Sequence, residues 1–353
     1  MAHVLDDLGF VTRLDPKGMY GLTADFADQC RRALEISQKV QAPKITKPQV
    51  VVLSGLGGSA AGGDFTKALF DAQSDVPFIV NRDYHLPSWV DSDTLVFCAS
   101  YSGNTEETLS AYADAQKVGA RVIAITSGGK LAELAAKDGH TAVISPGGQP
   151  PRTALGYMMI PTIYMCSELG LLPGQDFATD LATVDTSALE WGVDAPYESN
   201  VAKQLGQTLH GKLSVLYGLG GWQAIVANRW KGQINENAKN MTFSAAFPEL
   251  NHNEILGWVK ANEQGVANWV TVILEDGTES AKMKARATVT SDLIKGQCEI
   301  VRIHAPGQTL LSKMLNLTLL GDFVSLYLAA LNGVDPENID SINTLKNELS
   351  KVS

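Results

Sequence analysis

Short apolar runs alternate with amphipathic stretches from about residue 50 onward, and this alternation limits the possible folds more than any other feature. Five apolar runs of the first half are predicted to be strands, at residues 49–53, 77–80, 94–99, 121–126 and 141–144. Helical periodicity lies between and after them, at residues 59–70, 105–117, 129–137 and 153–169. Alternating strands and helices, with continuous Val, Ile and Leu in the strands, are typical of a parallel sheet covered on both faces.

The same pattern starts again in the second half of the chain. Strands are predicted at residues 213–217, 268–274 and 297–303, helices at 221–239, 278–293 and 308–331, and a tail helix at 340–351. The segment VVVLSGLGGS, which ends at Ser59, aligns with LSVLYGLGGW, which ends at Trp222. Both copies follow a predicted strand and begin a predicted helix, so we expect one fold to occur twice.

The length of 353 residues also favours two domains, because single hydrophobic cores rarely grow beyond about 250–300 residues. We therefore predict two doubly wound, flavodoxin-like α/β domains. The predicted organisation is an N-terminal helical segment, a first domain, a linker, a second domain and a C-terminal helix, at residues 1–45, 46–170, 171–196, 197–334 and 335–353.

Charge and cysteine content exclude several classes of function. The net charge is −10 and no stripe of Lys and Arg is present, so we expect no nucleic-acid partner. The four cysteines show no metal-binding or CxxC spacing, which predicts reduced thiols. The N-terminus carries Asp6 and Asp7 rather than a basic start, and no 18 consecutive apolar residues occur. We expect a cytoplasmic protein with no membrane segment.

The segment CASYSGNTEETL carries the strongest local signal for a ligand. It follows a predicted buried strand and provides three hydroxyl groups, on Ser100, Ser102 and Thr105, just before a helix. Backbone N–H groups, short side-chain donors and the positive end of a helix dipole together suit a phosphate dianion. The alternative is a simple N-cap, in which Thr105 caps the helix and Gly103 and Asn104 only turn the chain.

The glycine-rich turn GLGGSA, residues 55–60, allows three interpretations. It fits the loose G-x-G-x-x-A pattern, in which glycines let the backbone approach a phosphate at a helix N-terminus. A dinucleotide cofactor would require a carboxylate at the end of the next strand, where the sequence offers Asn81, Arg82 and Asp83. The third interpretation is a tight turn without a ligand.

Several motifs together resemble sugar isomerase (SIS) domains, specifically the bifunctional phosphoglucose/phosphomannose isomerases. SYSGNTEET is typical of the SIS fold, GLGGSAAGG and PPRTALGY accompany it, and NENAKN with ELNHNE narrows the resemblance to the bifunctional group. The resemblance covers nearly the whole chain. It implies that the substrate phosphate is bound by the first domain, at Gly58, Ser59, Ser100, Ser102 and Thr105.

The resemblance also implies a reaction, the interconversion of fructose 6-phosphate with glucose 6-phosphate and mannose 6-phosphate through a cis-enediol. Glu236 in NENAKN corresponds to the base that moves the proton. Arg152 in PPRTALGY corresponds to a guanidinium that stabilises the enediolate. From the residues alone, Glu236 could instead be a solvated helix residue paired with Lys239, and Arg152 a surface arginine.

Two further residues receive roles only through the resemblance. His252 in ELNHNE corresponds to a ring-opening histidine that reaches the active site of the neighbouring subunit, which implies an obligate homodimer. Lys346 in the tail helix corresponds to a lysine that assists at the ring oxygen. Without the resemblance, a structural hydrogen bond is an equally good interpretation of His252, and a tail lysine such as Lys346 is usually only solvated.

We expect no metal and no cofactor, because HExxH is absent and the six histidines are isolated in the sequence. In the family, one pocket side chain distinguishes glucose 6-phosphate from mannose 6-phosphate, and its position cannot be aligned in this sequence.

Two competing functions remain. A non-catalytic sugar-phosphate sensor would usually carry a DNA-binding segment, and none is evident. A dinucleotide-dependent oxidoreductase would explain GLGGSA but not SYSGNTEET.

Overall fold

The computed structural model describes residues 3–264, 268–349 and 351, and it places the strands in two parallel sheets. The chain divides into two units. The first-sheet unit contains Asp25–Asp185 and Gly307–Met314. The second-sheet unit contains Met1–Ala24, Thr186–Pro306 and Leu315–Ser353. The unit boundary at residues 185 and 186 falls inside the predicted linker, and the first 24 residues group with the second sheet.

The first sheet has five parallel strands in the order β2-β1-β3-β4-β5. Their bounds are β1 (Val50–Ser54), β2 (Phe78–Asn81), β3 (Thr94–Ser100), β4 (Arg121–Thr126) and β5 (Thr141–Ile144). This is the flavodoxin-like strand order, which confirms the predicted doubly wound α/β fold. All seven residues of β3 are buried, because this strand lies at the centre of the sheet.

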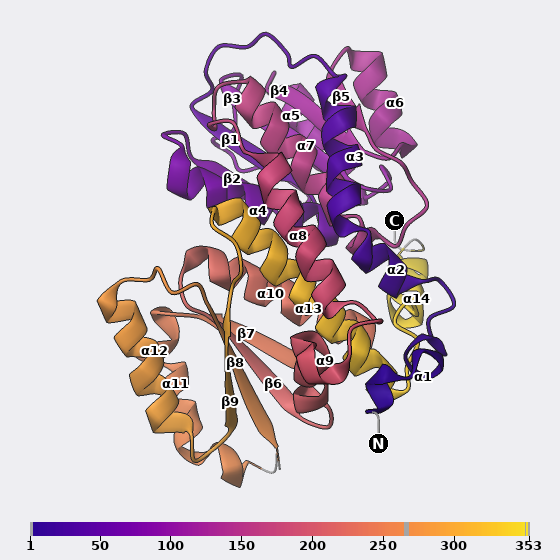
Figure 1. The fold of residues 1–353 in the computed structure, drawn as a ribbon. Helices are drawn as coiled ribbons and strands as arrows, with labels where there is room; N and C mark the ends of the chain where they lie inside the picture. The colour runs from indigo at the N-terminus through magenta and orange to yellow at the C-terminus, as the bar shows by residue number, and fades with distance from the viewer. Residues whose placement is uncertain (1–2, 265–267, 350, 352–353) are drawn as a thin grey trace. The chain divides into compact units, whose positions relative to one another are not determined.

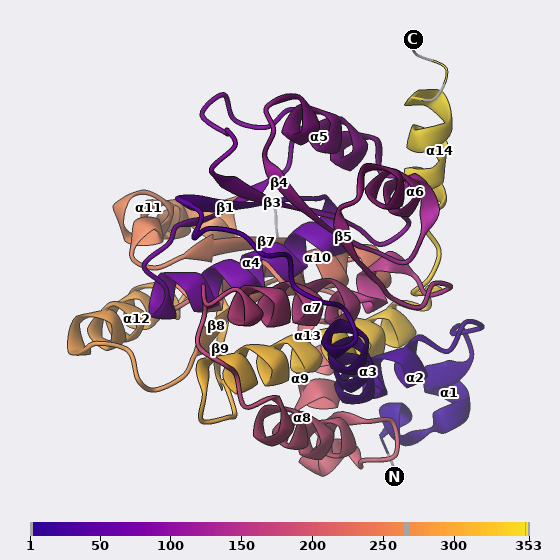
Figure 2. The same ribbon diagram turned by 90° about the horizontal axis from the view of Figure 1, so that it is seen from above.

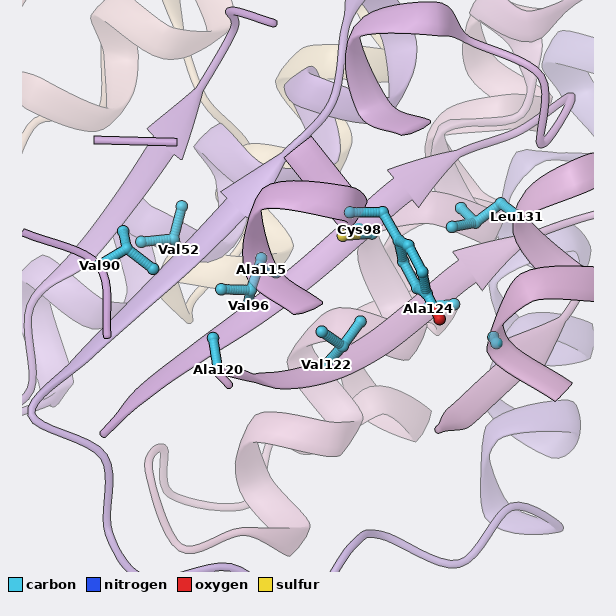
Figure 3. Close-up of a cluster of buried hydrophobic side chains, with 11 residues drawn as sticks. Val52, Val90, Val96, Cys98, Ala115, Ala120, Val122, Ala124 and Leu131 are labelled. Carbon is cyan, nitrogen blue, oxygen red and sulfur yellow. The ribbon is translucent and has the colours of Figure 1, made fainter. Parts of the chain in front are cut away.

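Helices cover both faces of the first sheet (Figures 1 and 2). The helices of this unit are α3 (Phe26–Gln38), α4 (Gly57–Gln73), α5 (Glu106–Lys117), α6 (Gly129–Asp138), the 3₁₀ turn η2 (Pro151–Thr153) and α7 (Leu155–Glu168). On the face covered by α5 and α6, alternate residues of β1, β3 and β4 form an apolar cluster that includes Val52, Val96 and Val122 (Figure 3). The alternation follows from the two-residue period of a strand.

The second sheet has four parallel strands in the order β7-β6-β8-β9. Their bounds are β6 (Leu213–Gly218), β7 (Thr242–Ala246), β8 (Trp269–Glu275) and β9 (Glu299–His304). The order is that of the first sheet without its fifth strand, so the predicted repetition of one fold extends to the topology. The indole of Trp230 donates to the carbonyl of Leu317 (2.7 Å), which joins the helix after β6 to the long apolar helix of this unit.

The helices of the second half are α8 (Phe177–Trp191), α9 (Val201–Leu209), α10 (Gly221–Ala238), α11 (Glu254–Gly257), α12 (Ala281–Ile294), α13 (Leu310–Asn332) and α14 (Asp340–Leu349), with 3₁₀ turns η3 (Tyr197–Ser199), η4 (Glu249–His252) and η5 (Trp258–Glu263). Two of these helices, α8 and α13, have residues in both units. Among the described residues, only α13 has the length and mean hydropathy (1.6) of a membrane span, and 94% of that window is buried within the protein.

The elements that were not predicted from the sequence include strand β7 and helix α8, besides helix α9 and the short α11. Strand β7 is an edge strand in which only Thr242 is buried and Phe243 is 49% exposed, so its residues lack the continuous apolar character used to recognise strands. Helix α8 occupies the predicted linker. Its buried positions Phe177, Leu181 and Val184 have helical spacing, but the exposed Ala and Thr residues and the buried Asp180 between them hide the pattern.

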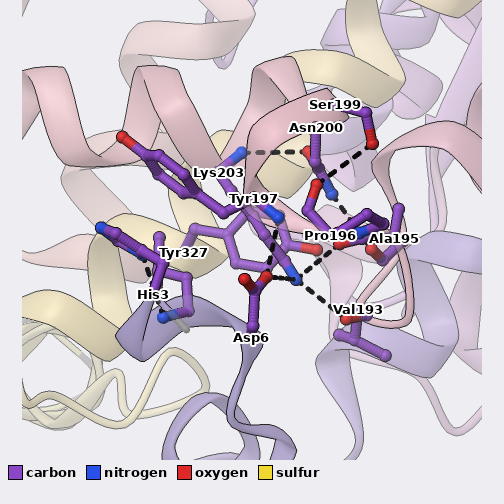
Figure 4. Close-up of polar contacts among 12 residues, drawn as sticks. His3, Asp6, Val193, Ala195, Pro196, Tyr197, Ser199, Asn200, Lys203 and Tyr327 are labelled. Carbon is purple, nitrogen blue, oxygen red and sulfur yellow. Dashed lines mark hydrogen bonds and ion pairs between the residues drawn. The ribbon is translucent and has the colours of Figure 1, made fainter. Parts of the chain in front are cut away.

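The N-terminal elements η1 (Val4–Asp6), α1 (Leu8–Thr12) and α2 (Met19–Ala24) belong to the second-sheet unit. The buried Lys203 joins them to it: its ammonium donates to the Asp6 carboxylate (3.0 Å) and to the carbonyls of Val193 (3.0 Å) and Ala195 (2.7 Å) (Figure 4). The Asp6 carboxylate also accepts from the Tyr197 N–H (2.7 Å). All three protons of the ammonium therefore have acceptors, as a buried charge requires.

Candidate active site

The predicted phosphate-binding residues gather at the carboxyl ends of β1 and β3. These two strands are neighbours, but the helices that follow them, α4 and α5, lie on opposite faces of the sheet. In doubly wound sheets, ligands bind at the point where the chain diverges in this way. The residues that follow β1 include Gly58 and Ser59, and those that follow β3 form the segment Ser100–Thr105, which we call the phosphate loop.

Three of the predicted hydroxyls, those of Ser59, Ser100 and Thr105, form hydrogen bonds at the carboxyl ends of β1 and β3. The Ser100 and Thr105 hydroxyls hydrogen bond to each other (2.8 Å), and the Gly103 N–H donates to Ser100 Oγ (3.1 Å). Ser59, in the first turn of α4, accepts from the Tyr101 N–H (3.2 Å). Ser59 and Ser100 are both buried, so their hydroxyls are fixed rather than solvated.

Ser102 differs from the other hydroxyl residues because it is exposed. Its Oγ accepts from the Asn104 N–H (3.3 Å), which curls the loop tip. Thr105 stands at the N-cap of α5, yet its side chain makes no capping hydrogen bond and is paired with Ser100 instead. The simple N-cap interpretation is therefore wrong.

Glycines allow the loops at this corner to approach one another closely. Gly103 has φ +70°, and a Cβ there would lie 1.8 Å from the Gly128 carbonyl oxygen. A Cβ on Gly58 would lie 2.8 Å from the Pro151 carbonyl oxygen and 3.8 Å from the Arg152 Cα. Any side chain at either position would push these backbones apart.

Arg152 lies in the 3₁₀ turn Pro151–Thr153 and is 5% exposed, so its interpretation as a surface arginine is wrong. The contact with Gly58 places its backbone against the first turn of α4, one residue from Ser59. A guanidinium keeps its charge when buried and can donate several hydrogen bonds to an anion. The first-sheet unit therefore brings together Arg152, Gly58 and the hydroxyl residues.

The second copy of the glycine turn is built differently. Trp222 stands where the first copy has Ser59, and the Gln223 amide donates to the Glu279 carboxylate (3.2 Å) in the segment after β8. The Glu279 carboxylate also accepts from the Asp276 N–H (2.6 Å). A carboxylate in this position repels a phosphate, so the anion-binding character belongs to the first copy.

The proposed base Glu236 lies near the carboxyl end of α10, in the second-sheet unit, and is half-buried. The neighbouring Asn235 side chain accepts from the Thr242 N–H (3.0 Å) and donates to the Thr242 carbonyl (3.2 Å). Thr242 is the first residue of β7. Glu236 therefore lies at the amino-terminal end of this edge strand.

His252 is at the other end of the same strand. It is the last residue of η4, which follows β7, and it is exposed. A strand rises about 3.3 Å per residue, so the length of β7 separates the regions of Glu236 and His252 by roughly 15 Å. The second-sheet unit does not bring these two predicted residues together.

Lys346 is exposed on α14, a helix with no buried residue. The chain that leads into α14 is tied to the end of α10, because the Lys239 ammonium donates to the Asp335 carbonyl (2.5 Å) and the Asn332 amide to the Ala238 carbonyl (2.9 Å). The approach to α14 is therefore on the same side of the unit as Glu236.

The dinucleotide interpretation predicts a carboxylate at the end of β2. That strand ends instead in Asn81, whose amide donates to Ser54 Oγ (3.1 Å), and Arg82 is ion-paired with Asp64. Asp83 is exposed, and its carboxylate accepts from the N–H of the next residue (2.7 Å). The geometry therefore gives no support to a ribose-binding carboxylate at this strand.

Within the described ranges, no three His, Cys, Asp or Glu side chains are close enough together to hold a metal ion.

Tyr101 is a residue at this corner that the sequence analysis did not single out. It is buried between Ser100 and Ser102, and its position inside the hydroxyl-rich motif is the only sequence signal that could have identified it.

Comparison with known proteins identifies both halves of the chain. Residues 44–151 match the model of the SIS domain, and residues 198–349 match that of the bacterial phospho-glucose isomerase C-terminal SIS domain. A bifunctional phosphoglucose/phosphomannose isomerase of Caldicellulosiruptor bescii is 43% identical over 95% of this chain and 99% of its own length. One of Aquifex aeolicus is 33% identical over 88% of this chain and 93% of its own length.

A similar fold is found among solved structures. A hypothetical protein of Thermus thermophilus aligns with a TM-score of 0.76 and 17% identity, covering 98% of this chain and 93% of that protein. At this identity the likeness concerns the fold alone. It agrees with the two parallel sheets described above.

Proposed function

Because this chain belongs to the family of bifunctional phosphoglucose/phosphomannose isomerases, we propose that it interconverts fructose 6-phosphate with glucose 6-phosphate and mannose 6-phosphate. The protein is an aldose-ketose isomerase that acts through a cis-enediol. The observation that carries this proposal is the 43% identity to a named relative over 95% of the chain. The alternative, a non-catalytic sensor, has no comparable support.

The substrate phosphate is bound by Ser59, Ser100, Ser102 and Thr105, with Gly58 leaving room for the backbone. Two observations support this assignment. The Ser100 and Thr105 hydroxyls are already held together at 2.8 Å, and Thr105 is not used as a helix cap. The N-terminal end of α5 adds a positive partial charge, which favours a dianion.

In the direction from ketose to aldose, Glu236 removes a proton from C1 of fructose 6-phosphate, and the electron pair of that C–H bond forms the C1–C2 double bond of the enediolate. While it is on the Glu236 carboxyl, this proton exchanges with solvent. A proton is then delivered from Glu236 to C2, O2 gains the proton that O1 gives up, and the carbonyl forms at C1. Arg152 stabilises the negative charge on the enediolate oxygens. A positioned base contributes roughly 10²–10⁴-fold to such a rate.

The active enzyme is a homodimer in which His252 serves the site of the neighbouring subunit. The separation of Glu236 and His252 along β7 supports this arrangement, because one chain does not offer both residues to the same sugar carbons. Leu256 and Val259, close to His252 in sequence, are 69% and 68% exposed and provide an apolar surface for a second copy. Lys346 acts at the ring oxygen.

The substrates are charged sugar phosphates that do not cross membranes unaided, so we place the enzyme in the cytoplasm. This location and the dimer form part of the same proposal. Both are compatible with an acidic chain whose pI is about 5.1.

A coupled assay with fructose 6-phosphate in the presence of a chelator tests the function. We expect formation of both glucose 6-phosphate and mannose 6-phosphate by the wild-type chain, at a rate that the chelator does not change. Binding of fructose 6-phosphate without turnover would instead support a sensor. A thermal shift with NAD or NADP but none with sugar phosphate would support an oxidoreductase.

A further inference from the structure

Tyr101 is hydrogen bonded to three other segments at the carboxyl edge of the first sheet. Its N–H donates to Ser59 Oγ (3.2 Å) after β1. Its carbonyl accepts from the Ser127 N–H (2.9 Å) and the Ser127 hydroxyl (2.6 Å) after β4. Its phenol donates to the Pro146 carbonyl (2.9 Å) and accepts from the Gln149 N–H (3.3 Å) after β5.

The hydrogen bonds of the Tyr101 phenol hold a different segment of the chain from those of its backbone groups. The backbone groups of Tyr101 order the phosphate loop itself, whereas the phenol reaches the segment that leads into Arg152. Gln149 is followed by Pro150 and Pro151, whose fixed φ angles stiffen the connection to Arg152. A displacement at Gln149 is therefore passed on to the arginine backbone.

The other side of this segment is held by α3. The buried Gln29 amide donates to the Thr153 carbonyl (2.8 Å) and to Gln149 Oε1 (3.0 Å), and its oxygen accepts from the Gly156 N–H (2.8 Å). Gln29 fixes the turn to the helical layer, and the Tyr101 phenol fixes the same turn to the phosphate loop. Both side chains therefore hold the segment that contains Arg152.

We propose that Tyr101 is a positioning residue for isomerisation: its phenol hydroxyl holds Arg152 at a fixed place relative to the bound phosphate. This inference rests on the proposed function. Stabilisation of an enediolate depends on a guanidinium that is already in place when charge develops, and a misplacement of about 1 Å can cost about 10²-fold in rate. The phenol itself is hydrogen bonded to Pro146 and Gln149, not to the hydroxyls assigned to the phosphate.

The test compares Tyr101→Phe with Tyr112→Phe. Tyr112 is a matched control: it is a buried tyrosine of the same unit, and its hydroxyl donates to Asp138 (2.7 Å) and accepts from Gln116 (3.2 Å). Asp138 ends α6, so these bonds lie at the amino-terminal edge of the sheet. Both variants lose two hydrogen bonds, but only Tyr101→Phe touches the turn of Arg152.

We expect Tyr101→Phe to lower kcat about 10-fold or more, with KM for fructose 6-phosphate changed less than about 3-fold. Tyr112→Phe should lower only the melting temperature. In a double-mutant cycle, Tyr101→Phe should have little further effect once Arg152 is replaced by Ala, because the hydroxyl acts through that arginine. Amide hydrogen exchange of residues 146–153 should also become faster in Tyr101→Phe.

Several results would overturn the inference while leaving the proposed function intact: a Tyr101→Phe enzyme with wild-type kcat, a loss expressed mainly in KM, or additive effects with Arg152→Ala. Unchanged exchange at residues 146–153 would also overturn it. Absence of turnover in the wild-type chain refutes the proposed function, and the positioning role with it. The wild-type assay therefore separates the two failures.

Discussion

At the scale of single residues, the hydroxyls of the phosphate loop could be predicted because they are adjacent in sequence and follow a recognisable strand. The burial of Arg152 could not, since it depends on tertiary packing, and the backbone of Arg152 lies against Gly58, which is 94 positions away. The same holds for Tyr101, whose partners Ser59, Pro146 and Gln149 lie 42, 45 and 48 positions away. Local patterns identify ligand-binding loops, but they do not reveal which side chains hold those loops together.

His140 should make the protein sensitive to mild acid. Burial lowers its pKa, and the Asp138 carboxylate raises it only in part. Above about pH 6.5 the ring is neutral in both the folded and unfolded states, so it has no effect. Below that value the unfolded chain binds a proton more readily than the folded chain, and stability is lost as the pH falls towards the folded pKa.

Replacement by asparagine isolates this effect, because His140→Asn cannot titrate. Urea midpoints measured at pH 7.5 and pH 5.5 should fall more in the wild type than in His140→Asn. Equal losses in the two proteins would show that His140 does not contribute to acid sensitivity.

At the scale of elements, strong apolar periodicity gave most strands and helices to within a few residues. The exceptions have physical causes: β7 is stabilised by its neighbour β6 rather than by its own composition, and α8 is only partly buried. The phosphate loop is an intermediate case. Its ligands are local, but its shape depends on packing against the loop at Gly128.

Gly103→Ala tests that packing. The substitution places a Cβ 1.8 Å from the Gly128 oxygen at φ +70°, so we expect lower stability and weaker binding of phosphate. Gly119→Ala is the matched control, since Gly119 has φ +71° with no atom within 4 Å of its added Cβ. In each variant the left-handed backbone costs about 1–2 kcal/mol.

Only Gly103→Ala should weaken the binding of inorganic phosphate, measured by isothermal titration calorimetry on the folded variant. Comparable phosphate affinity in the two variants would contradict the assigned shape of the loop.

At the scale of the whole molecule, the repeated glycine turn correctly predicted that one fold occurs twice: the four-stranded sheet has the strand order of the first sheet without its fifth strand. The resemblance to bifunctional phosphoglucose/phosphomannose isomerases is confirmed by relatives that match nearly the whole chain. Spacing alone could not assign Glu236 or His252, because neither residue lies in a motif whose spacing by itself identifies a catalytic role. Their placement at opposite ends of β7 becomes informative only when two copies of the chain are considered.

Mixing two inactive variants tests the shared site. If Glu236 and His252 act in one site from different subunits, Glu236→Gln and His252→Ala are each inactive, but their heterodimer contains one intact site. Random exchange of subunits should restore about one quarter of wild-type activity, as two-fold symmetry requires. Failure to recover activity, with heterodimers verified by mass spectrometry, would contradict the shared site.

The proton transfer itself provides the most direct test of the central claim. Fructose 6-phosphate is converted in D₂O by the wild-type chain and by Glu236→Gln, and the aldose products are examined by NMR. The account predicts deuterium at C2 of both glucose 6-phosphate and mannose 6-phosphate, with the rate reduced at least about 10²-fold in a folded Glu236→Gln enzyme. An undiminished rate in that variant would contradict an enediol formed by Glu236, and products that carry only protium at C2 would contradict exchange of the transferred proton with solvent.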